Sequence, residues 1–290
     1  MTSTRTRLRT EARFPAPGTE VACAVSGGAD SLALLVLAVD AGCRVTAIHV
    51  DHGLRAGSSD EAAVVAAAAE RFGARFETRT VEVAPGPNLE ARARAARYAV
   101  LPERALTGHT AEDQAETVLL NLLRGAGLDG LAGIRDDGRR PLLRVRRADT
   151  RALCAELGLE PVADPSNDDP AFRRNRVRHE LLPLLDAIGE RDVAAVIARQ
   201  ASSLAGEAAL LDELAAAIDV SDAKVLAAAP PPLARRAVRA WLRAPDGGHP
   251  PDQATVERVL DVARGSVVAC EVAGVGRVAR SGGRLRLEPL

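Results

Sequence analysis

Lysine is almost missing from this 290-residue chain: of its 38 basic residues, only Lys224 is a lysine. A Walker phosphate loop, which needs Gly-Lys followed by Ser or Thr, is therefore excluded. Aromatic residues make up only 2% of the chain, so Leu, Val and Ala must fill the core, for which a hydrophobic content of 47% is sufficient. The formal net charge of −1 argues against a uniformly basic nucleic-acid-binding protein, so local arginine clusters are more informative than the total.

Cysteines are few and lie far apart, at Cys23, Cys43, Cys154 and Cys270. The chain has no Cys-x-x-Cys pair, so we expect neither a zinc site nor an iron–sulfur site, and no structural metal. The sequence also lacks a signal peptide and any apolar run of 18 residues. Together with reduced thiols, these absences predict a cytoplasmic protein that does not use a membrane.

The most specific motif is Ser26-Gly27-Gly28-Ala29-Asp30-Ser31, which joins a short apolar run to a helix-like run. Adjacent glycines let a ligand approach the backbone closely, and the free N–H groups at a helix start suit a phosphate. Ser26 and Ser31 add hydroxyl donors, and Asp30 beside a phosphate indicates Mg²⁺ between them. The alternative is an ordinary glycine-rich turn with Ser31 as a cap, but the six-residue pattern is more specific than two glycines.

Strand and helix signals alternate through the first half of the chain. The expected strands cover residues 21–25, 44–50, 75–83 and 105–107, and the expected helices cover 31–41, 59–72, 89–101 and 111–123. Repeated βα units predict an α/β fold with a doubly wound parallel sheet and helices on both faces. In such sheets, ligands bind at the carboxyl ends of the strands.

The second half of the chain is mainly helical, with expected helices over 149–157, 177–218, 235–242 and 253–263 and a β meander over 267–287. We therefore expect four parts. These are a flexible arm over 1–18, a nucleotide-binding domain over 19–147, a linker and basic junction over 148–182, and a helical C-terminal domain over 183–290.

A second motif, residues 49–55, ends the second expected strand with His49, Asp51 and His52. Alternation along a strand places His49 and Asp51 on one face, which favours a site over the alternative of a surface loop capped by Asp51. Since the spacing of the histidines does not form a metal triad, we expect polar contacts to a nucleotide or substrate.

A third motif, residues 107–117, begins with Gly108 and His109 and continues into a helix. Thr110 can cap this helix, with Asp113 at the reciprocal position. Asp113 and Glu116 then lie three residues apart on one helix face. A well-capped surface helix is the simpler interpretation, but it leaves His109 unexplained.

Two arginine runs, 139–151 and 173–179, flank these motifs. Arginine at a helix start opposes the helix dipole, so we expect the second run to face an external anion. A solvated surface is the usual alternative for any one run, but two runs beside a site favour contacts to a phosphate backbone. The candidate residues are Arg124, Arg140, Arg144, Arg173, Arg174, Arg176 and Arg178.

The loop at 26–31 resembles that of the N-type ATP pyrophosphatases, which split ATP between the α and β phosphates and attach AMP to a substrate oxygen. The first two thirds of the chain are similar to the tRNA(Ile)-lysidine synthetases. Besides this loop, the matching residues are 49–55, 107–117, 124–133 and Asp164-Pro-Ser-Asn167 through Arg178. The resemblance implies an adenine nucleotide α-hydrolase-like fold and the use of ATP and Mg²⁺. It implies adenylation of C2 of the wobble cytidine in tRNA-Ile with a CAU anticodon, followed by attack of free L-lysine.

The resemblance also implies roles for particular residues. Expected ATP contacts are Ser26, Gly27, Gly28, Asp30, Ser31, His49, Asp51, His52, Gly108 and His109, with Mg²⁺ at Asp30. Expected catalytic residues are Asp30, Asp113 and Glu116, the last two on the lysine side. The arginines named above become expected tRNA contacts, with the C-terminal domain also touching tRNA.

The chain departs from the family in three places: a short connector before Thr107, Glu112 where Asp is common, and a compact C-terminal region. Three rival functions stay open: a tRNA thiolation enzyme, a ligase for free nucleotides, and a nucleotide-binding module without activity. A thiolation enzyme usually needs catalytic cysteines, and a ligase for free nucleotides usually needs a glutaminase segment. The sequence also allows a homodimer.

Overall fold

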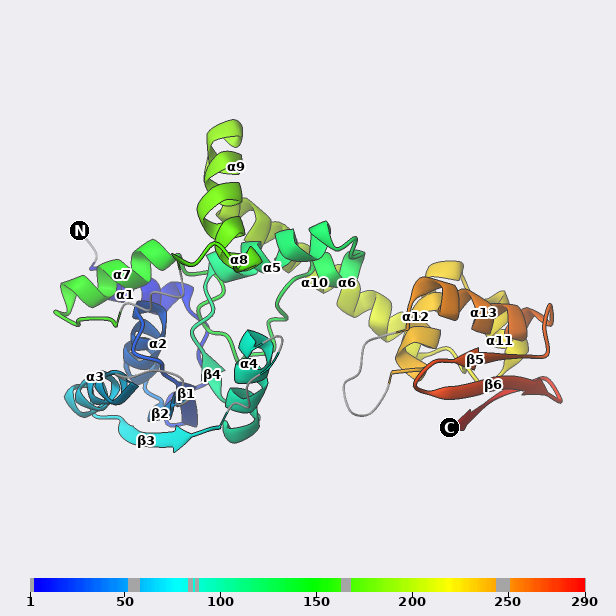
Figure 1. Ribbon diagram of the computed structural model, residues 1–290, viewed down its shortest axis with the longest axis horizontal. Coiled ribbons are helices and arrows are strands. Elements are labelled where there is room, and N and C mark those ends of the chain that lie inside the picture. Colours follow the sequence, from blue (N-terminus) through cyan, green and yellow to red (C-terminus); the bar gives the residue numbers. More distant parts are fainter. Residues whose placement is uncertain are drawn as a thin grey trace. The chain divides into compact units, whose positions relative to one another are not determined.

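The computed structural model describes residues 3–51, 58–82, 86, 89–162, 168–243 and 251–289 (Figure 1). His52, most of the 49–55 motif and the Asp164–Asn167 segment lie outside these ranges. The chain divides into two compact units, Met1–Leu204 and Ala205–Leu290, which are described separately. The finer domain boundaries expected from the sequence stay predictions.

A four-stranded parallel sheet forms the centre of the first unit. Its strands are β1 (Glu20–Ala24), β2 (Arg44–Asp51), β3 (Arg75–Thr80) and β4 (Leu106–Thr107), in the spatial order β3-β2-β1-β4. Cys23 of β1 pairs with Ala47 of β2 on one side and with Leu106 of β4 on the other. The predicted parallel sheet is confirmed, although β3 and β4 are shorter than expected.

Helices cover both faces of this sheet, which confirms the doubly wound α/β fold. On one face, Cys23 packs into a cluster with α2 (Ala29–Asp40), α3 (Ser58–Arg71) and α7 (Arg147–Glu156). On the other face, Ala22 and Ala24 pack with residues at the end of α4 (Leu89–Val100). The strands therefore alternate between two apolar faces, as expected for a sheet buried on both sides.

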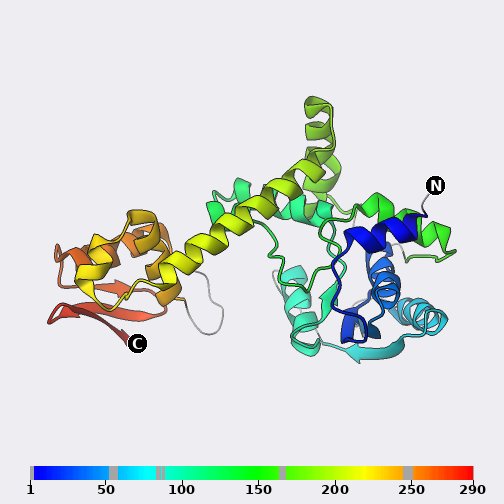
Figure 2. The same ribbon diagram turned by 180° about the vertical axis from the view of Figure 1, so that it is seen from behind.

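The N-terminal arm expected to be flexible is instead a helix, α1 (Thr4–Glu11), capped by Ser3. Leu8 is fully buried in the core of the unit, and Arg7 pairs with Asp149 at the start of α7. Figure 2 shows α1, in blue, alongside α7. This helix is held by one buried apolar side chain and a few arginine ion pairs. A single buried residue gives no repeat of apolar residues at helical spacing, so the sequence did not predict the helix.

The rest of the first unit is helical and contains α5, α6, α8, a π-helical turn η2 and α9. Their bounds are α5 (Ala111–Leu123), α6 (Leu128–Leu131), α8 (Arg173–Arg176), η2 (Val177–Leu181) and α9 (Leu182–Gly189). The helix expected over 177–218 is interrupted after α9, because Glu190 takes the left-handed conformation that ends a helix. A new helix, α10 (Val193–Ala216), follows and contains the boundary between the two units.

The second unit is a small helical domain with a β meander, as predicted. It contains α11 (Ala223–Ala228), α12 (Pro231–Trp241), α13 (Gln253–Arg264) and the antiparallel strands β5 (Ala269–Val272), β6 (Gly276–Ser281) and β7 (Arg284–Pro289). Leu226, Val238, Leu260 and Val278 form the centre of its core. In the part of the chain that the structure describes, no helix has the length and apolar character needed to cross a membrane.

Candidate active site

The strand order places a topological switch point at the carboxyl ends of β1 and β4. From β1 the chain continues to β2 and β3 on one side, and then moves to β4 on the other side of β1. Open α/β sheets bind ligands in the crevice at such a point. The glycine loop follows β1 and the third motif follows β4, so two of the three motifs converge there.

The glycine loop has a shape that only glycine adopts easily. Gly27 has a φ of +84°, and a Cβ at that position would lie 3.2 Å from the Val162 side chain. The Ser26 N–H donates to the Ser31 hydroxyl, at 3.1 Å, and this hydroxyl donates to the Gly28 carbonyl, at 2.8 Å. Ser31, expected to be a donor to phosphate, thus braces the loop from inside, whereas Ser26 is exposed.

The start of α2 is open to an anion. Gly28 is its N-cap and contributes no side-chain hydrogen bond, and among the described residues no side chain caps the free N–H groups of this turn. A helix N-terminus of this kind attracts negative charge through its free N–H groups and its dipole. The backbone around Gly27 and Gly28 could therefore hold an anion such as a phosphate group.

Gly108 connects the two loops of the switch point. A Cβ at this position would lie 2.7 Å from the backbone oxygen of Asp30 and 3.0 Å from its carbonyl carbon, both in the first turn of α2. The turn after β4 can approach the glycine loop this closely only because Gly108 has no side chain. The sequence singled out Gly108, but its contact with α2 is visible only in the structure.

His49, on β2, makes a hydrogen bond to Val25, the residue that follows β1. The imidazole is 1% exposed, and its Nδ1 donates to the carbonyl oxygen of Val25, 3.1 Å away. Its other nitrogen, Nε2, is buried and has no hydrogen-bond partner among the described residues. Asp51 is half-buried at the end of the same strand, and no contact that the structure shows tests the expected ATP roles of these two residues.

The carboxylates predicted on α5 lie together in a cluster of charged side chains. Glu116 is fully buried and accepts hydrogen bonds from Arg174 Nε at 2.6 Å, Arg178 Nε at 2.7 Å and Arg147 Nη1 at 3.4 Å. Asp113 contacts Arg174 Nη2 at 2.7 Å and Arg147 Nη2 at 3.1 Å. The shared face predicted for Asp113 and Glu116 is therefore confirmed.

Asp113 also belongs to the capping box expected at the start of α5, which is present. The Thr110 N–H donates to its Oδ2 at 2.8 Å. Burial alone would raise the pKa of Asp113, but Arg147, Arg174 and this hydrogen bond together hold that pKa well below its usual range. Asp113 therefore stays ionised at neutral pH.

Arg147 links the glycine loop to α5, a role that the sequence did not reveal. Its Nε donates to Asp30 Oδ2 at 3.0 Å, while its two terminal nitrogens reach Asp113 and Glu116. Burial alone would lower the pKa of Arg147, but the three carboxylates raise it above its ordinary value. We refer to Asp30, Asp113, Glu116, Arg147, Arg174 and Arg178 as the charge cluster, in which three negative and three positive groups balance.

The expectation that the second arginine run faces an external anion is wrong for Arg174 and Arg178. Both point at Glu116, because α8 and η2 pack against α5 and give their charge a partner inside the protein. Arg173 and Arg176 are exposed, as are Arg124 and Arg144, and Arg176 pairs with Glu180. Arg140 is half-buried and pairs with Asp137.

The residues present do not form the Mg²⁺ site expected at Asp30. Its Oδ2 accepts from Arg147, and its Oδ1 accepts from the Thr150 hydroxyl at 2.5 Å. A cation at Asp30 would lie next to the Arg147 guanidinium, a group of the same charge sign. Over the described ranges, no set of three His, Cys, Asp or Glu side chains could hold a metal ion. Burial raises the pKa of Asp30, while Arg147 and Thr150 oppose this change.

Cys154, which contacts the glycine-loop motif at Ala29, is a poor nucleophile, and this bears on the thiolation alternative. Cys154 is buried, and its thiol donates to the carbonyl oxygen of Ala29 at 3.6 Å. Burial and the nearby Asp30 raise its pKa to about 11, so little thiolate exists at neutral pH. The charge cluster itself contains no thiol.

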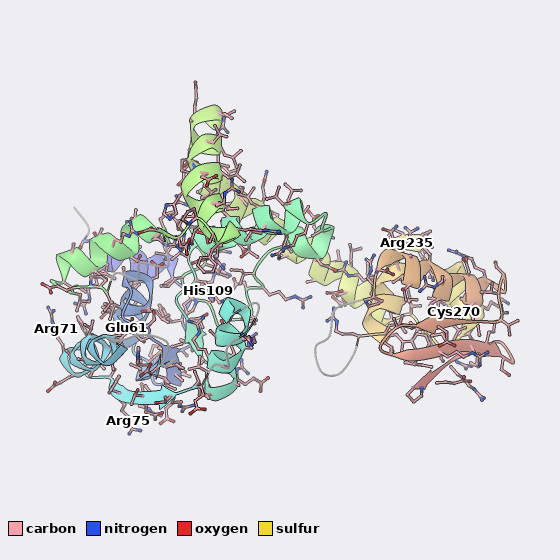
Figure 3. All side chains as sticks on the ribbon, in the orientation of Figure 1. Glu61, Arg71, Arg75, His109, Arg235 and Cys270 are labelled. Atoms are coloured by element: carbon pink, nitrogen blue, oxygen red, sulfur yellow. The ribbon has the colours of Figure 1, made fainter. Side chains whose placement is uncertain are left out.

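His109 is expected to make the protein less stable in acid. It lies between β4 and α5 (Figure 3), with Nδ1 2.8 Å from Thr107 Oγ1. Burial lowers its pKa from 6.5 to about 4, although Asp113 opposes this shift. Between these values the unfolded chain binds a proton that the folded chain does not, so stability falls as the pH decreases. The prediction concerns the fall in unfolding free energy from pH 7 to pH 5, measured by urea titration. We expect this fall to be about 1–2 kcal/mol smaller in a His109→Asn variant than in the parent. Equal losses in the two proteins would contradict this role.

The glycine loop at the switch point is typical of one class of protein, the ATP-using enzymes with a PP-loop. A family model described as "PP-loop domain" matches residues 2–185, and one described as "TilS substrate binding domain" matches residues 222–286. The U34-tRNA thiolase NcsA from Methanococcus maripaludis has a similar fold, with a TM-score of 0.57 over 70% of this chain and 78% of that chain. Because its sequence identity is 18%, this likeness concerns the fold alone.

Close relatives narrow the class to one family. The tRNA(Ile)-lysidine synthase of Nocardia farcinica is 48% identical over 246 residues, which cover 79% of this chain and 77% of the relative. That of Rhodococcus erythropolis is 47% identical over 242 residues, covering 78% of this chain and 74% of the relative. The chain belongs to the tRNA(Ile)-lysidine synthase family.

Proposed function

We propose that this protein is a ligase that uses ATP to join lysine to tRNA-Ile, with lysidine, AMP and pyrophosphate as products. The new C–N bond forms at C2 of the wobble cytidine in the CAU anticodon, through an adenylated cytidine. The observation that carries this proposal is the junction between an open phosphate loop and the charge cluster, in a chain of this family. The thiols of Cys23, Cys43 and Cys154 are buried, which disfavours sulfur transfer, the principal alternative.

The chemistry explains why a phosphate loop is needed. The C2 carbonyl of cytidine is a poor electrophile, and AMP attached to its oxygen is a good leaving group. The N-terminus of α2 and the backbone of Gly27 and Gly28 would hold the phosphates, with Ser26 exposed beside them. Preorganised N–H groups of this type stabilise developing negative charge without reorganisation.

The charge cluster suits free lysine, which carries groups of both signs. Asp113 and Glu116 would attract the α-amino group, and Arg174 or Arg178 would attract the carboxylate, after local exchange of their ion pairs. The ε-amine must arrive deprotonated to attack C2. Glu116 is already enclosed by three guanidinium groups, so it orients these arginines rather than acting as a free base.

Magnesium enters the proposal with ATP rather than through a protein site. Mg²⁺ keeps several water ligands and is commonly bound through substrate phosphates. Asp30 already accepts hydrogen bonds from Arg147 and Thr150, so its carboxylate would support the loop and Arg147. The match of residues 222–286 to a substrate-binding domain supports contact between the C-terminal part of the chain and tRNA.

Pyrophosphate release tests the proposed function. The purified protein would be assayed with ATP, Mg²⁺ and a tRNA-Ile transcript carrying CAU, with and without lysine. We expect release to require the tRNA, and lysine to convert the modified base to lysidine, detected by mass spectrometry of nucleosides. Sulfur incorporation, or release with a small nucleotide in place of tRNA, would overturn the proposal.

The exposed arginines of α8 provide a prediction on tRNA binding. Replacing Arg173 and Arg176 by Ala should weaken tRNA binding and lower the magnitude of the log–log salt slope by roughly 0.7–0.9 for each lost phosphate contact. The ATP affinity should not change, because neither residue belongs to the charge cluster. An Arg174→Ala variant is the comparison, since it breaks a pair with Glu116. Parallel salt slopes for the parent and the double variant would place the RNA surface elsewhere.

A further inference from the structure

A groove of about 480 Å³ lies on the first unit, beside the charge cluster. Its apolar lining comes from Leu120 and Leu123 of α5 and from Val177, Leu181 and Leu184 of η2 and α9. Leu123 is 71% exposed and Leu184 is 55% exposed. Large aliphatic side chains gathered in an open groove are typical of a binding surface.

The groove continues the two helix faces that form the charge cluster. On α5, Asp113, Glu116, Leu120 and Leu123 follow one another at intervals of three or four residues, which places them along one stripe. Seven residues separate Glu116 from Leu123, a rise of about 10 Å along a helix. A nucleic-acid strand with one base at the charge cluster would therefore have its neighbouring nucleotides near the groove.

Positive charge dominates the rim of the groove. Arg124, Arg173 and Arg176 line it, opposed by the single carboxylate of Glu180. Arg176 pairs with Glu180 at 2.9 Å, whereas no ion pair of Arg124 or Arg173 occurs among the described residues. A symmetric dimer through this face would set the same arginines against one another, which is unfavourable. A polyanion with apolar surface fits this rim better.

We propose that this groove holds one unpaired nucleobase next to the reacting cytidine, with its flanking phosphates on Arg124 and Arg173. This inference rests on the proposed function and deepens it by naming a subsite for the substrate RNA. Single-stranded loops present unstacked bases to proteins. Protein surfaces usually bind such bases by stacking on aromatic rings, but here leucine and valine side chains form the platform.

The double variant Leu123→Gln/Leu184→Gln tests the subsite. Both side chains are exposed, so we expect the fold and the KM for ATP to stay unchanged. The KM for the tRNA should rise about tenfold or more, as for loss of a base platform. Because the rim arginines remain, the salt slope of tRNA binding should not change. Leu122→Gln, which is 55% exposed but does not line the groove, is the matched control.

The second measurement uses anticodon stem-loops in which each nucleotide beside the reacting cytidine is made abasic in turn. The parent should lose affinity about tenfold at one position, and the double variant should not respond there. Equal tRNA KM values in parent and double variant would overturn the subsite. A change in oligomeric state without a change in KM would also overturn it and would assign the groove to a second copy. Absence of tRNA-dependent pyrophosphate release by the parent would instead be a failure of the proposed function.

Discussion

A Glu116→Gln variant is expected to lose nearly all ligation activity and about 2–4 kcal/mol of unfolding free energy. Glu116 is fully buried and faces three guanidinium groups. The amide keeps the volume of the side chain but removes the negative charge and presents N–H donors to other donors. Arg147, Arg174 and Arg178 would then repel one another inside the site, with 15–28% of their side-chain surface exposed to water.

Urea unfolding and lysidine yield, measured on the same preparation, would check this prediction. Activity should be assayed at a temperature where circular dichroism shows the variant to be folded, so that loss of activity is separate from unfolding. Glu180→Gln is the matched control, because Glu180 is exposed and pairs with a single arginine, Arg176. Parent-like stability and lysidine yield in Glu116→Gln would show that the charge cluster does not hold the site together.

Gly108→Ala is expected to lower kcat/KM for ATP about 100-fold, since displacement of a reacting group by about 1 Å can have that effect. The added Cβ would lie 2.7 Å from the Asp30 carbonyl oxygen, closer than such atoms approach, so the first turn of α2 or the turn after β4 must shift. Overpacking of this kind costs about 1–3 kcal/mol of stability. The shift would also disturb the hydrogen bonds that Asp30 accepts from Arg147 and Thr150.

Assays of pyrophosphate release at varied ATP concentration, with saturating tRNA and lysine, would measure this effect. Gly127→Ala is the control, because a Cβ at position 127 would have no atom within 4 Å and the backbone φ there is −80°. An unchanged kcat/KM for ATP in Gly108→Ala would mean that the close approach of the two loops has no role in ATP use. A loss in both variants would indicate a general sensitivity of the helical segment after β4.

Local features of the fold could be predicted from the sequence because they depend on neighbours along the chain. Alternating strand and helix patterns predicted the parallel sheet, and the 111–123 pattern predicted α5 with its bounds and capping box. The two glycines after β1 predicted a phosphate loop at a helix start, and the structure shows Gly27 in a conformation suited to glycine. Each of these signals lies within a few residues.

The sequence by itself therefore determined the parallel α/β sheet, the glycine loop and the shared face of Asp113 and Glu116. Only the tertiary structure decided which charges meet: Arg147 pairs with Asp30 across 117 positions, and Arg174 pairs with Glu116 across 58. It also decided that Leu8 anchors α1, where the sequence predicted a flexible arm. Electrostatic pairing and burial depend on distance in space, and an arginine run reads the same in the sequence whether its side chains face water or a buried carboxylate.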